Sequence, residues 1–128
     1  MARVTGIGGV FLRTPDPKRL TAWYEKHLGL KPTDFGIMLQ YDDDIAAQPK
    51  GTSMTVWSPF PQHTEYFGPD NQAVMINYRV DDIDAIVDAL TEAGEWVDPK
   101  RMDESYGRFA WAKDCDGNRI ELWQPLGD

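Results

Sequence analysis

The sequence predicts an α+β fold in which one strand–helix–strand–strand–strand unit occurs twice. Three observations support it: an internal repeat, strand-like alternation of apolar residues, and two segments with helical apolar spacing. The repeat has an offset of 66 residues (79 − 13, for example). Its matching pairs are Arg13 and Arg79, Asp16 and Asp82, Leu20 and Ile86, Gly51 and Gly117, Trp57 and Trp123, and Pro59 and Pro125. Because these pairs share one offset and fall at equivalent places, we interpret the chain as a duplicated unit.

The first repeat opens with a strand and a helix. Residues 8–14 alternate between apolar and mixed positions, which is typical of a half-buried strand. Asp16 suits the N-cap and Pro17 the first position of a helix whose apolar residues continue to Leu28. Gly29 is placed to end this helix.

The second repeat follows the same plan. Val74–Val80 is the predicted strand, and Asp82 caps a helix that ends near Gly94. Its apolar positions are Ile83, Ile86, Val87 and Leu90.

Further strands are expected in both repeats, at 37–41, 52–57, 96–97, 108–113 and, after a turn at Asp116–Gly117, up to Pro125. Residues 1–128 then form a single domain with module one at 4–60, a connection at 61–72 rich in turn residues, and module two at 73–126.

Alternation along the strands separates two faces. The face expected under the helices carries Val10, Leu12, Met54, Val56, Ile76, Tyr78, Val80, Ile120 and Leu122. The opposite face carries Gly9, Phe11, Arg13, Ser53, Thr55, Trp57, Met75, Asn77, Arg79, Arg119, Glu121 and Trp123. This second set mixes aromatic, polar and charged residues, as a curved sheet around a wet cleft requires. The predicted ligand-binding residues are therefore Phe11, Arg13, Thr55, Trp57, Met75, Asn77, Arg79, Arg119 and Trp123.

Glu121 is the candidate catalytic residue, because a carboxylate in mid-strand between large apolar neighbours needs a partner or a function. One hypothesis makes it a general base or a ligand-orienting carboxylate. The other, which we favour at this point, pairs it with Arg13, Arg79 or Arg119 across the cleft.

Other candidates also have two interpretations. Trp57 and Trp123 are placed either to stack on a planar or cationic ligand or to pack near strand ends. Arg13 and Arg79 either clamp an anionic ligand or form structural ion pairs. The remaining candidates have little specific signal: a lid built from His63, Tyr66 and Phe67, the acidic run Asp42–Asp44, and Cys115.

Composition limits the class of protein. The 128 residues are 41% hydrophobic, with no apolar run of membrane-spanning length, and contain one cysteine. With no signal-peptide pattern at the start, a cytoplasmic address is expected. The formal net charge of −8 argues against nucleic acid as a partner, because binding phosphates requires clustered Lys and Arg.

Three segments together resemble the vicinal-oxygen-chelate superfamily, which includes glyoxalase I, the bleomycin-resistance proteins and the extradiol dioxygenases. They are DPKRLTAWYEKHLGL (16–30), NYRVDDIDAIVDALTEAG (77–94) and YGRFAWAKDCDGNRIELWQP (106–125). The resemblance implies two βαβββ modules that form a cup-shaped mixed sheet of eight strands, the glyoxalase/bleomycin-resistance fold. It also implies a homodimer, and it leaves open whether the cup forms within one chain or between two.

In metal-using members of that superfamily, one side chain on the first strand and one on the last strand of each module hold a divalent ion. Here the corresponding positions are Gly9, Thr55, Met75 and Glu121, and only Glu121 suits such an ion. No cofactor is therefore expected. A divergent divalent-metal site that recruits His63 stays as the alternative.

Two functions follow from the resemblance. The first is a protein of the bleomycin-resistance type that binds a small molecule in the cup without a family-type metal. The alternative is an enzyme, a lyase or isomerase of the lactoylglutathione-lyase type or a dioxygenase-like protein, with Glu121 as acid or base or with a divergent metal site.

Overall fold

The computed structural model describes residues 2–34, 36–40, 54–69 and 71–126. The predictions at Asp42–Asp44, Gly51 and Ser53 lie outside the described residues. Ten elements follow one another: β1 (Val4–Thr14), α1 (Pro17–Leu28), β2 (Pro32–Thr33), β3 (Gly36–Gln40), β4 (Met54–Pro61), β5 (Val74–Val80), α2 (Ile83–Glu92), β6 (Met102–Glu104), β7 (Gly107–Lys113) and β8 (Arg119–Pro125).

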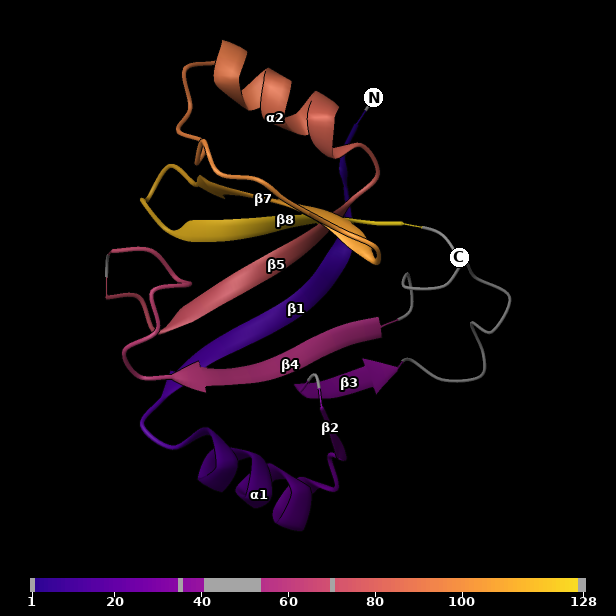
Figure 1. Cartoon of the computed structure of the whole chain (residues 1–128), viewed down its shortest axis with the longest axis vertical. Helices are drawn as coiled ribbons and strands as arrows, with labels where there is room; N and C mark the ends of the chain where they lie inside the picture. Colours follow the sequence, from indigo (N-terminus) through magenta and orange to yellow (C-terminus); the bar gives the residue numbers. More distant parts are fainter. Residues whose placement is uncertain (1, 35, 41–53, 70, 127–128) are drawn as a thin grey trace.

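The strands form one curled sheet in the order β2-β3-β4-β1-β5-β8-β7-β6, with the helices at its two ends (Figure 1). β1 is antiparallel to β5, while β1 with β4 and β5 with β8 are parallel pairs. The halves therefore meet at the β1–β5 pair, and each contributes four strands. The predicted α+β cup is confirmed, and one chain supplies all eight of these strands.

Capping residues set the helix boundaries as predicted. The Asp16 carboxylate accepts a hydrogen bond from the Arg19 N–H at 3.1 Å, and Asp82 accepts one from the Ala85 N–H at 3.1 Å. Gly29 ends α1 in the left-handed conformation, with φ of 70°. Because each cap satisfies main-chain groups that a helix end leaves open, these residues fix where each helix begins or stops.

Apolar packing occurs on both faces of the sheet. Under α2, Ile83 is fully buried with Val80, Ala110 and Leu122. On the concave face a second cluster contains Phe11, Phe67, Met75, Phe109 and Trp111. Phe67 comes from the connection between the modules and is 0% exposed, so this segment is packed into the cup.

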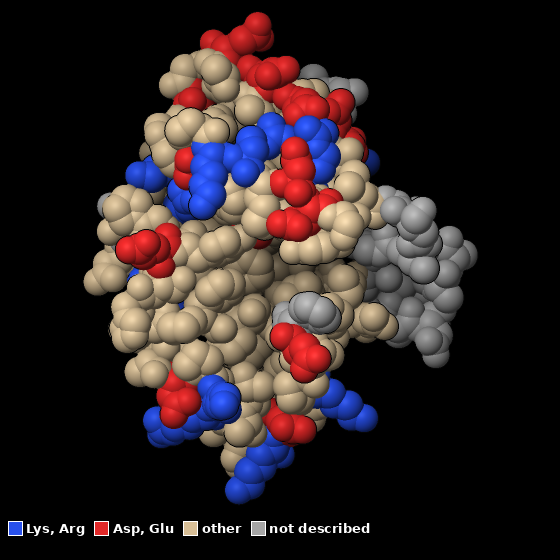
Figure 2. All heavy atoms as spheres, in the orientation of Figure 1, with Lys and Arg blue, Asp and Glu red and all other residues tan. Residues whose placement is uncertain are grey.

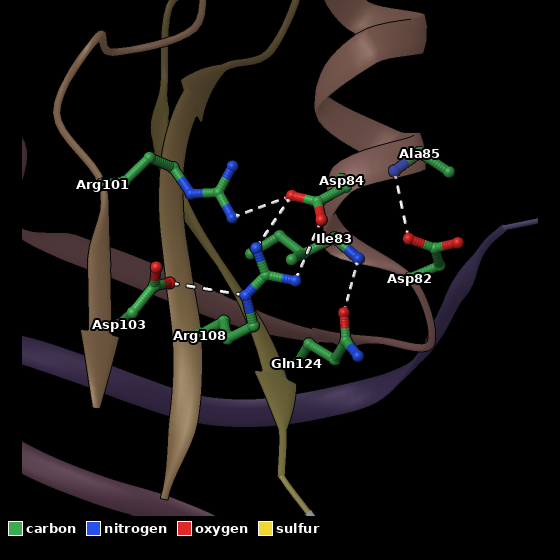
Figure 3. A network of polar contacts seen from close by, with 8 residues as sticks. All are labelled: Asp82, Ile83, Asp84, Ala85, Arg101, Asp103, Arg108 and Gln124. Atoms are coloured by element: carbon green, nitrogen blue, oxygen red, sulfur yellow. Dashed lines mark hydrogen bonds and ion pairs between the residues drawn. The ribbon is translucent and has the colours of Figure 1, made fainter. Parts of the chain in front are cut away.

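Charged side chains tie the first turn of α2 to β7 and to Arg101, the residue before β6 (Figure 3). Asp84 accepts hydrogen bonds from Arg108 Nη1 and Nη2 at 3.0 Å and from Arg101 Nη2 at 3.2 Å. Below it, the Gln124 side chain of β8 accepts a hydrogen bond from the Ile83 N–H at 2.8 Å. These contacts help to fix α2 against the strands of its own module.

One predicted strand is wrong. Residues 96–97 form no strand; Val97 makes only an isolated bridge to Ala112. The edge position next to β7 is taken instead by β6, whose Met102 and Glu104 pair with Phe109 and Gly107. An edge strand of three residues is too short to show alternation in the sequence.

Neither helix in the described part of the chain has the length and apolar character that crossing a bilayer requires.

Candidate functional site

The pairing of the strands shows which residues are equivalent in the two modules. Phe11 of β1 pairs with Ser58 of β4, and Asn77 of β5 pairs with Glu121 of β8. Phe11 and Asn77 are 66 residues apart, the offset of the repeat, but Ser58 and Glu121 are 63 apart (121 − 58). The offset therefore shifts by three residues before the last strand of module two.

An odd shift turns a strand over, because side chains alternate between the faces of a sheet. Thr55 and Trp57, predicted to line the cleft, face the other way. The Thr55 hydroxyl donates to the Ile7 carbonyl at 3.0 Å, and the Trp57 ring packs on Tyr24 of α1, 4.7 Å between centroids. Met54 and Val56, predicted to lie under the helices, line the cup instead.

The cup encloses a cavity of about 540 Å³, within the usual range for small-molecule sites. Figure 2 shows it as a hollow with uncharged walls between charged groups above and below. Its lining residues are Gly8, Phe11, Met38, Met54, Val56, Ser58, Phe60, Tyr66, Asn77, Met102, Tyr106, Phe109, Glu121 and Trp123. A second cavity, about 660 Å³, runs along α1 from Thr14 to His27 and shares none of these residues. We place the candidate site in the cup, because the cup holds the buried carboxylate.

Glu121 is 1% exposed and accepts hydrogen bonds from three uncharged side chains. Asn77 Nδ2 donates to Oε1 at 2.6 Å, and Trp111 Nε1 donates to Oε2 at 2.8 Å. The Tyr66 hydroxyl also donates to Oε2. A Trp N–H can only donate, so this arrangement suits the ionised carboxylate, which only accepts.

Burial and hydrogen bonding act on this carboxyl in opposite directions. Burial raises the pKa of Glu121 above its ordinary value, and the bonds from Tyr66, Asn77 and Trp111 offset part of the rise. Burial and the charge of Glu121 also raise the pKa of Tyr66, so the phenol keeps its proton and acts as donor. The result is a buried carboxylate that is more basic than an exposed one.

The favoured ion pair of Glu121 with an arginine is wrong for the described residues. Arg119 pairs instead with Asp98, at 3.1 Å. Arg13 donates to the Gln62 carbonyl at 2.9 Å, and Arg79 donates to the Met54 carbonyl at 3.0 Å. The Arg13 and Arg79 guanidinium groups thus hold the main chain around the cup, and none of the three arginines is a lining residue.

Two stacked aromatic pairs form the walls. Phe60 and Tyr66 stack at 12° with 5.4 Å between centroids, and Phe109 and Trp123 stack at 1° with 6.1 Å. Trp123 lies between two glycines: a Cβ would fall 2.7 Å from its ring at Gly8 and 2.1 Å from its Nε1 at Gly107. Only residues without a side chain leave room for the indole there.

Residues 6–122 match the sequence model of the Glyoxalase/Bleomycin resistance protein/Dioxygenase superfamily. The chain belongs to this superfamily. No curated protein sequence matches it significantly.

Solved structures share the superfamily fold at low identity. A Streptomyces coelicolor methylmalonyl-CoA epimerase in complex with 2-nitronate-propionyl-CoA is 16% identical, with a TM-score of 0.71 and coverage of 98% of this chain and 100% of that one. Methylmalonyl-CoA epimerase from Mycobacterium tuberculosis is 20% identical, with a TM-score of 0.62 and coverage of 96% and 89%. A superfamily member from Vibrio splendidus 12B01 is 15% identical, with a TM-score of 0.59 and coverage of 97% and 99%. At these identities the likeness shows the fold alone.

The superfamily's metal positions do not fit a divalent ion in this chain. The strand pairing replaces Thr55 with Ser58 as the position equivalent to Glu121. Gly9 has no side chain, and the soft Met75 thioether is 0% exposed within the aromatic cluster. Glu121 accepts three hydrogen bonds from N–H and O–H donors, which leave one of its roughly four lone-pair sites, too few for a divalent ion that needs several oxygen ligands.

The cup gathers only some of the residues predicted to form it. Phe11, Asn77, Glu121 and Trp123 line the cavity, while Met75 is buried behind them. Sequence reasoning treated Tyr66 as an unspecific loop residue, yet it lines the cup and bonds to Glu121. The signal in the sequence that could have predicted this placement is the adjacent aromatic residue Phe67, which anchors the connection in the core. His63, the suggested metal recruit, is exposed.

Proposed function

We propose that this superfamily member binds a small, largely apolar molecule in the cup, with Glu121 orienting it and without a metal at the superfamily's four positions. One observation carries the proposal: the 540 Å³ cavity has aromatic and thioether walls around a single buried carboxylate. Ligand sites commonly combine apolar walls with a few fixed polar groups.

The lining also argues against a coenzyme A ester, the kind of molecule named for the similar epimerase structures. Such esters carry phosphates, and methylmalonyl-CoA adds a carboxylate. None of the described residues that line the cup is Lys, Arg or His, whereas Glu121 is acidic. A polyanion would face a buried negative charge without a compensating partner.

Binding of the neutral fluorescent probe N-phenyl-1-naphthylamine tests the proposal. We expect saturable one-to-one binding to the wild-type protein, loss of binding in Val56→Trp, which fills the cup, and retention in Val74→Trp. Val74 is 42% exposed and outside the cup lining, so it controls for the added indole. Equal binding by the two variants would place the ligand elsewhere.

A second function, proton transfer in a lyase or isomerase, is favoured by the environment of Glu121. Burial raises the pKa of Glu121, which strengthens it as a base, and Tyr66 holds it in place with a hydrogen bond. The atom available to take a proton is Oε1, because Oε2 already accepts two hydrogen bonds.

The planar probe 5-nitrobenzisoxazole reports such a base directly. The carboxylate takes the C3 proton, the electrons of the C–H bond form the C≡N bond of a nitrile, and the electron pair of the broken N–O bond leaves on oxygen. The product is coloured 2-cyano-4-nitrophenolate. If Glu121 is the base, ring opening is faster with the wild-type protein than with Glu121→Gln, and Glu92→Gln, an exposed control on α2, matches the wild type. Identical rates in all three proteins would exclude this second function for Glu121.

A further inference from the structure

Asn77 and Glu121, which we call the floor of the cup, have hydrogen-bond acceptor capacity that is not used. Asn77 is 3% exposed, and its Oδ1 has no hydrogen-bond partner among the residues that the structure describes. The other atom of that amide, Nδ2, is committed to Glu121 Oε1. A carboxylate offers about four lone-pair sites, so the three bonds to Glu121 leave one acceptor place, on Oε1.

The donors that face Glu121 are already used. The Tyr66 hydroxyl and the Trp111 N–H both point to Glu121. The Trp123 Nε1 also lacks a partner in the described part of the chain, but it lies against Gly107 of β7, which is outside the cup lining, and is therefore turned toward the sheet. Asn77 Oδ1, in contrast, lies against Gly8, which is part of the lining. The hydrogen-bonding capacity that stays open beside Glu121 is therefore that of acceptors.

The charge of the cup and the chemistry of its walls also favour a ligand that donates hydrogen bonds. Glu121 is the one carboxylate among the described residues of the lining, and the whole chain carries a net charge of −8. Two stacked aromatic pairs form the walls, Phe60 with Tyr66 and Phe109 with Trp123. Flat aromatic walls favour planar rings, and their negative faces also favour cations.

We infer that the ligand is a planar aromatic ammonium compound. Its ring lies against the aromatic walls, and its N–H groups donate to Glu121 Oε1 and Asn77 Oδ1. This inference rests on the proposed binding in the cup and names the class of molecule bound there. Both acceptors belong to side chains at least 97% buried, so a donor from the ligand would fill hydrogen-bonding capacity that is costly to leave open.

Three naphthalene probes with the same ring separate charge from shape: 1-naphthylmethylammonium, 1-naphthalenemethanol and 1-naphthoate. Isothermal titration calorimetry of the wild-type protein should rank them ammonium, then alcohol, then carboxylate. We expect the ammonium to bind about tenfold more tightly than the alcohol, the size of one charge-assisted hydrogen bond in a desolvated site. The carboxylate should show no measurable binding.

Variants assign that preference to the floor. Glu121→Gln should lower ammonium affinity about tenfold while changing alcohol affinity less than about threefold. The exposed Glu92→Gln removes the same charge and should keep the wild-type ranking. If circular dichroism shows that Glu121→Gln is unfolded, Asn77→Leu replaces the open acceptor with a similar volume and should reduce the same preference.

The outcomes separate this inference from the function on which it rests. Equal affinities for ammonium and alcohol, or tighter binding of naphthoate, would overturn the ligand class and leave the cup as a binding site. An ammonium preference retained in a folded Glu121→Gln would overturn the inferred contact with Glu121 and also leave the cup as a binding site. Binding of none of the three probes, together with no binding of N-phenyl-1-naphthylamine, would overturn the inference and the proposed function together.

Discussion

Tyr66, from the segment between the modules, donates its phenolic hydrogen bond to the carboxylate of Glu121 on β8. The contact joins residues 55 positions apart, and it brings a donor from outside the repeated unit to the acidic residue of the cup. Phe67 is buried next to Tyr66 and holds the segment in place. The structure of the cup therefore depends on the connection as well as on the duplicated strands.

Removing the Tyr66 hydroxyl should destabilise the fold and make Glu121 harder to ionise. In Tyr66→Phe the ring still stacks on Phe60, but the carboxylate loses one of three donors. We expect a loss of about 2 kcal/mol in unfolding free energy, typical of a hydrogen bond to a charged group, and a further rise in the pKa of Glu121. Urea unfolding and carbon-13 NMR titration of the carboxyl measure the two effects.

Tyr106→Phe is the matched control. Tyr106 also lines the cup but is 60% exposed, and its hydroxyl makes no hydrogen bond to Glu121. If both variants lose the same unfolding free energy, the hydrogen bond from Tyr66 to Glu121 contributes no more to stability than the exposed hydroxyl of Tyr106.

The unfolding free energy should carry a pH dependence that comes from Glu121. Burial raises its pKa in the folded state, so between its ordinary value of 4.5 and the raised folded value the folded chain holds a proton that the unfolded chain has released. Stability from this group is complete below that window and falls as the pH rises through it. Urea unfolding from pH 4 to about 8 should show a shallower decline in Glu121→Gln than in the wild type. Parallel curves would mean that the folded pKa is close to 4.5.

The Asp84 contacts should behave in the opposite way. Hydrogen bonds from Arg108 and Arg101 lower the pKa of Asp84 in the folded protein. The stability that they add is therefore present above pH 3.8, the ordinary pKa, and is lost as the pH falls through the lowered folded-state pKa. Because the carboxylate is exposed to solvent, we expect only a small decrease in the urea midpoint of Asp84→Asn, which disappears in about 1 M sodium chloride. Asp88→Asn, on the same helix, should show no such salt-dependent difference. An effect of Asp84→Asn that survives high salt would point to packing.

The two tryptophans that the repeat aligned should have separate effects. Trp57→Phe should lower stability by about 1–3 kcal/mol, because the ring is buried against Tyr24, and leave probe affinity in the cup unchanged. Trp123→Phe should weaken probe binding several-fold, because the indole is part of the wall. Chemical denaturation and probe titration on both variants measure this. Weaker binding in Trp57→Phe would restore the face predicted from the repeat.

Chelation should leave the folded protein unchanged. Because the superfamily's metal positions lack suitable ligands, we expect the same melting temperature with and without EDTA, and no stoichiometric Ni, Zn, Mn or Fe by elemental analysis after incubation and desalting. Glu121→Ala is the comparison. Stoichiometric metal in the wild type that is absent from this variant would reverse the conclusion.

Local signals in the sequence were sufficient to predict the helices, the central strands β1 and β5, and the duplicated order of elements. Asp16, Pro17, Gly29 and Asp82 act within one helical turn, so their effect on the chain does not depend on distant residues. The alternation in β5 and β8 was equally readable, and it placed Asn77 and Glu121 on the concave face.

The composition of the site was decided by contacts between distant strands. A shift of three residues in the repeat, visible only in the pairing of Phe11 with Ser58, turned Thr55 and Trp57 out of the cup and brought Met54 and Val56 into it. The partners of Glu121 likewise come from three separate segments, the connection, β5 and β7, at Tyr66, Asn77 and Trp111. Sequence periodicity reports which residues of a strand share a face, but only tertiary packing decides which face turns inward and which donors reach a buried charge.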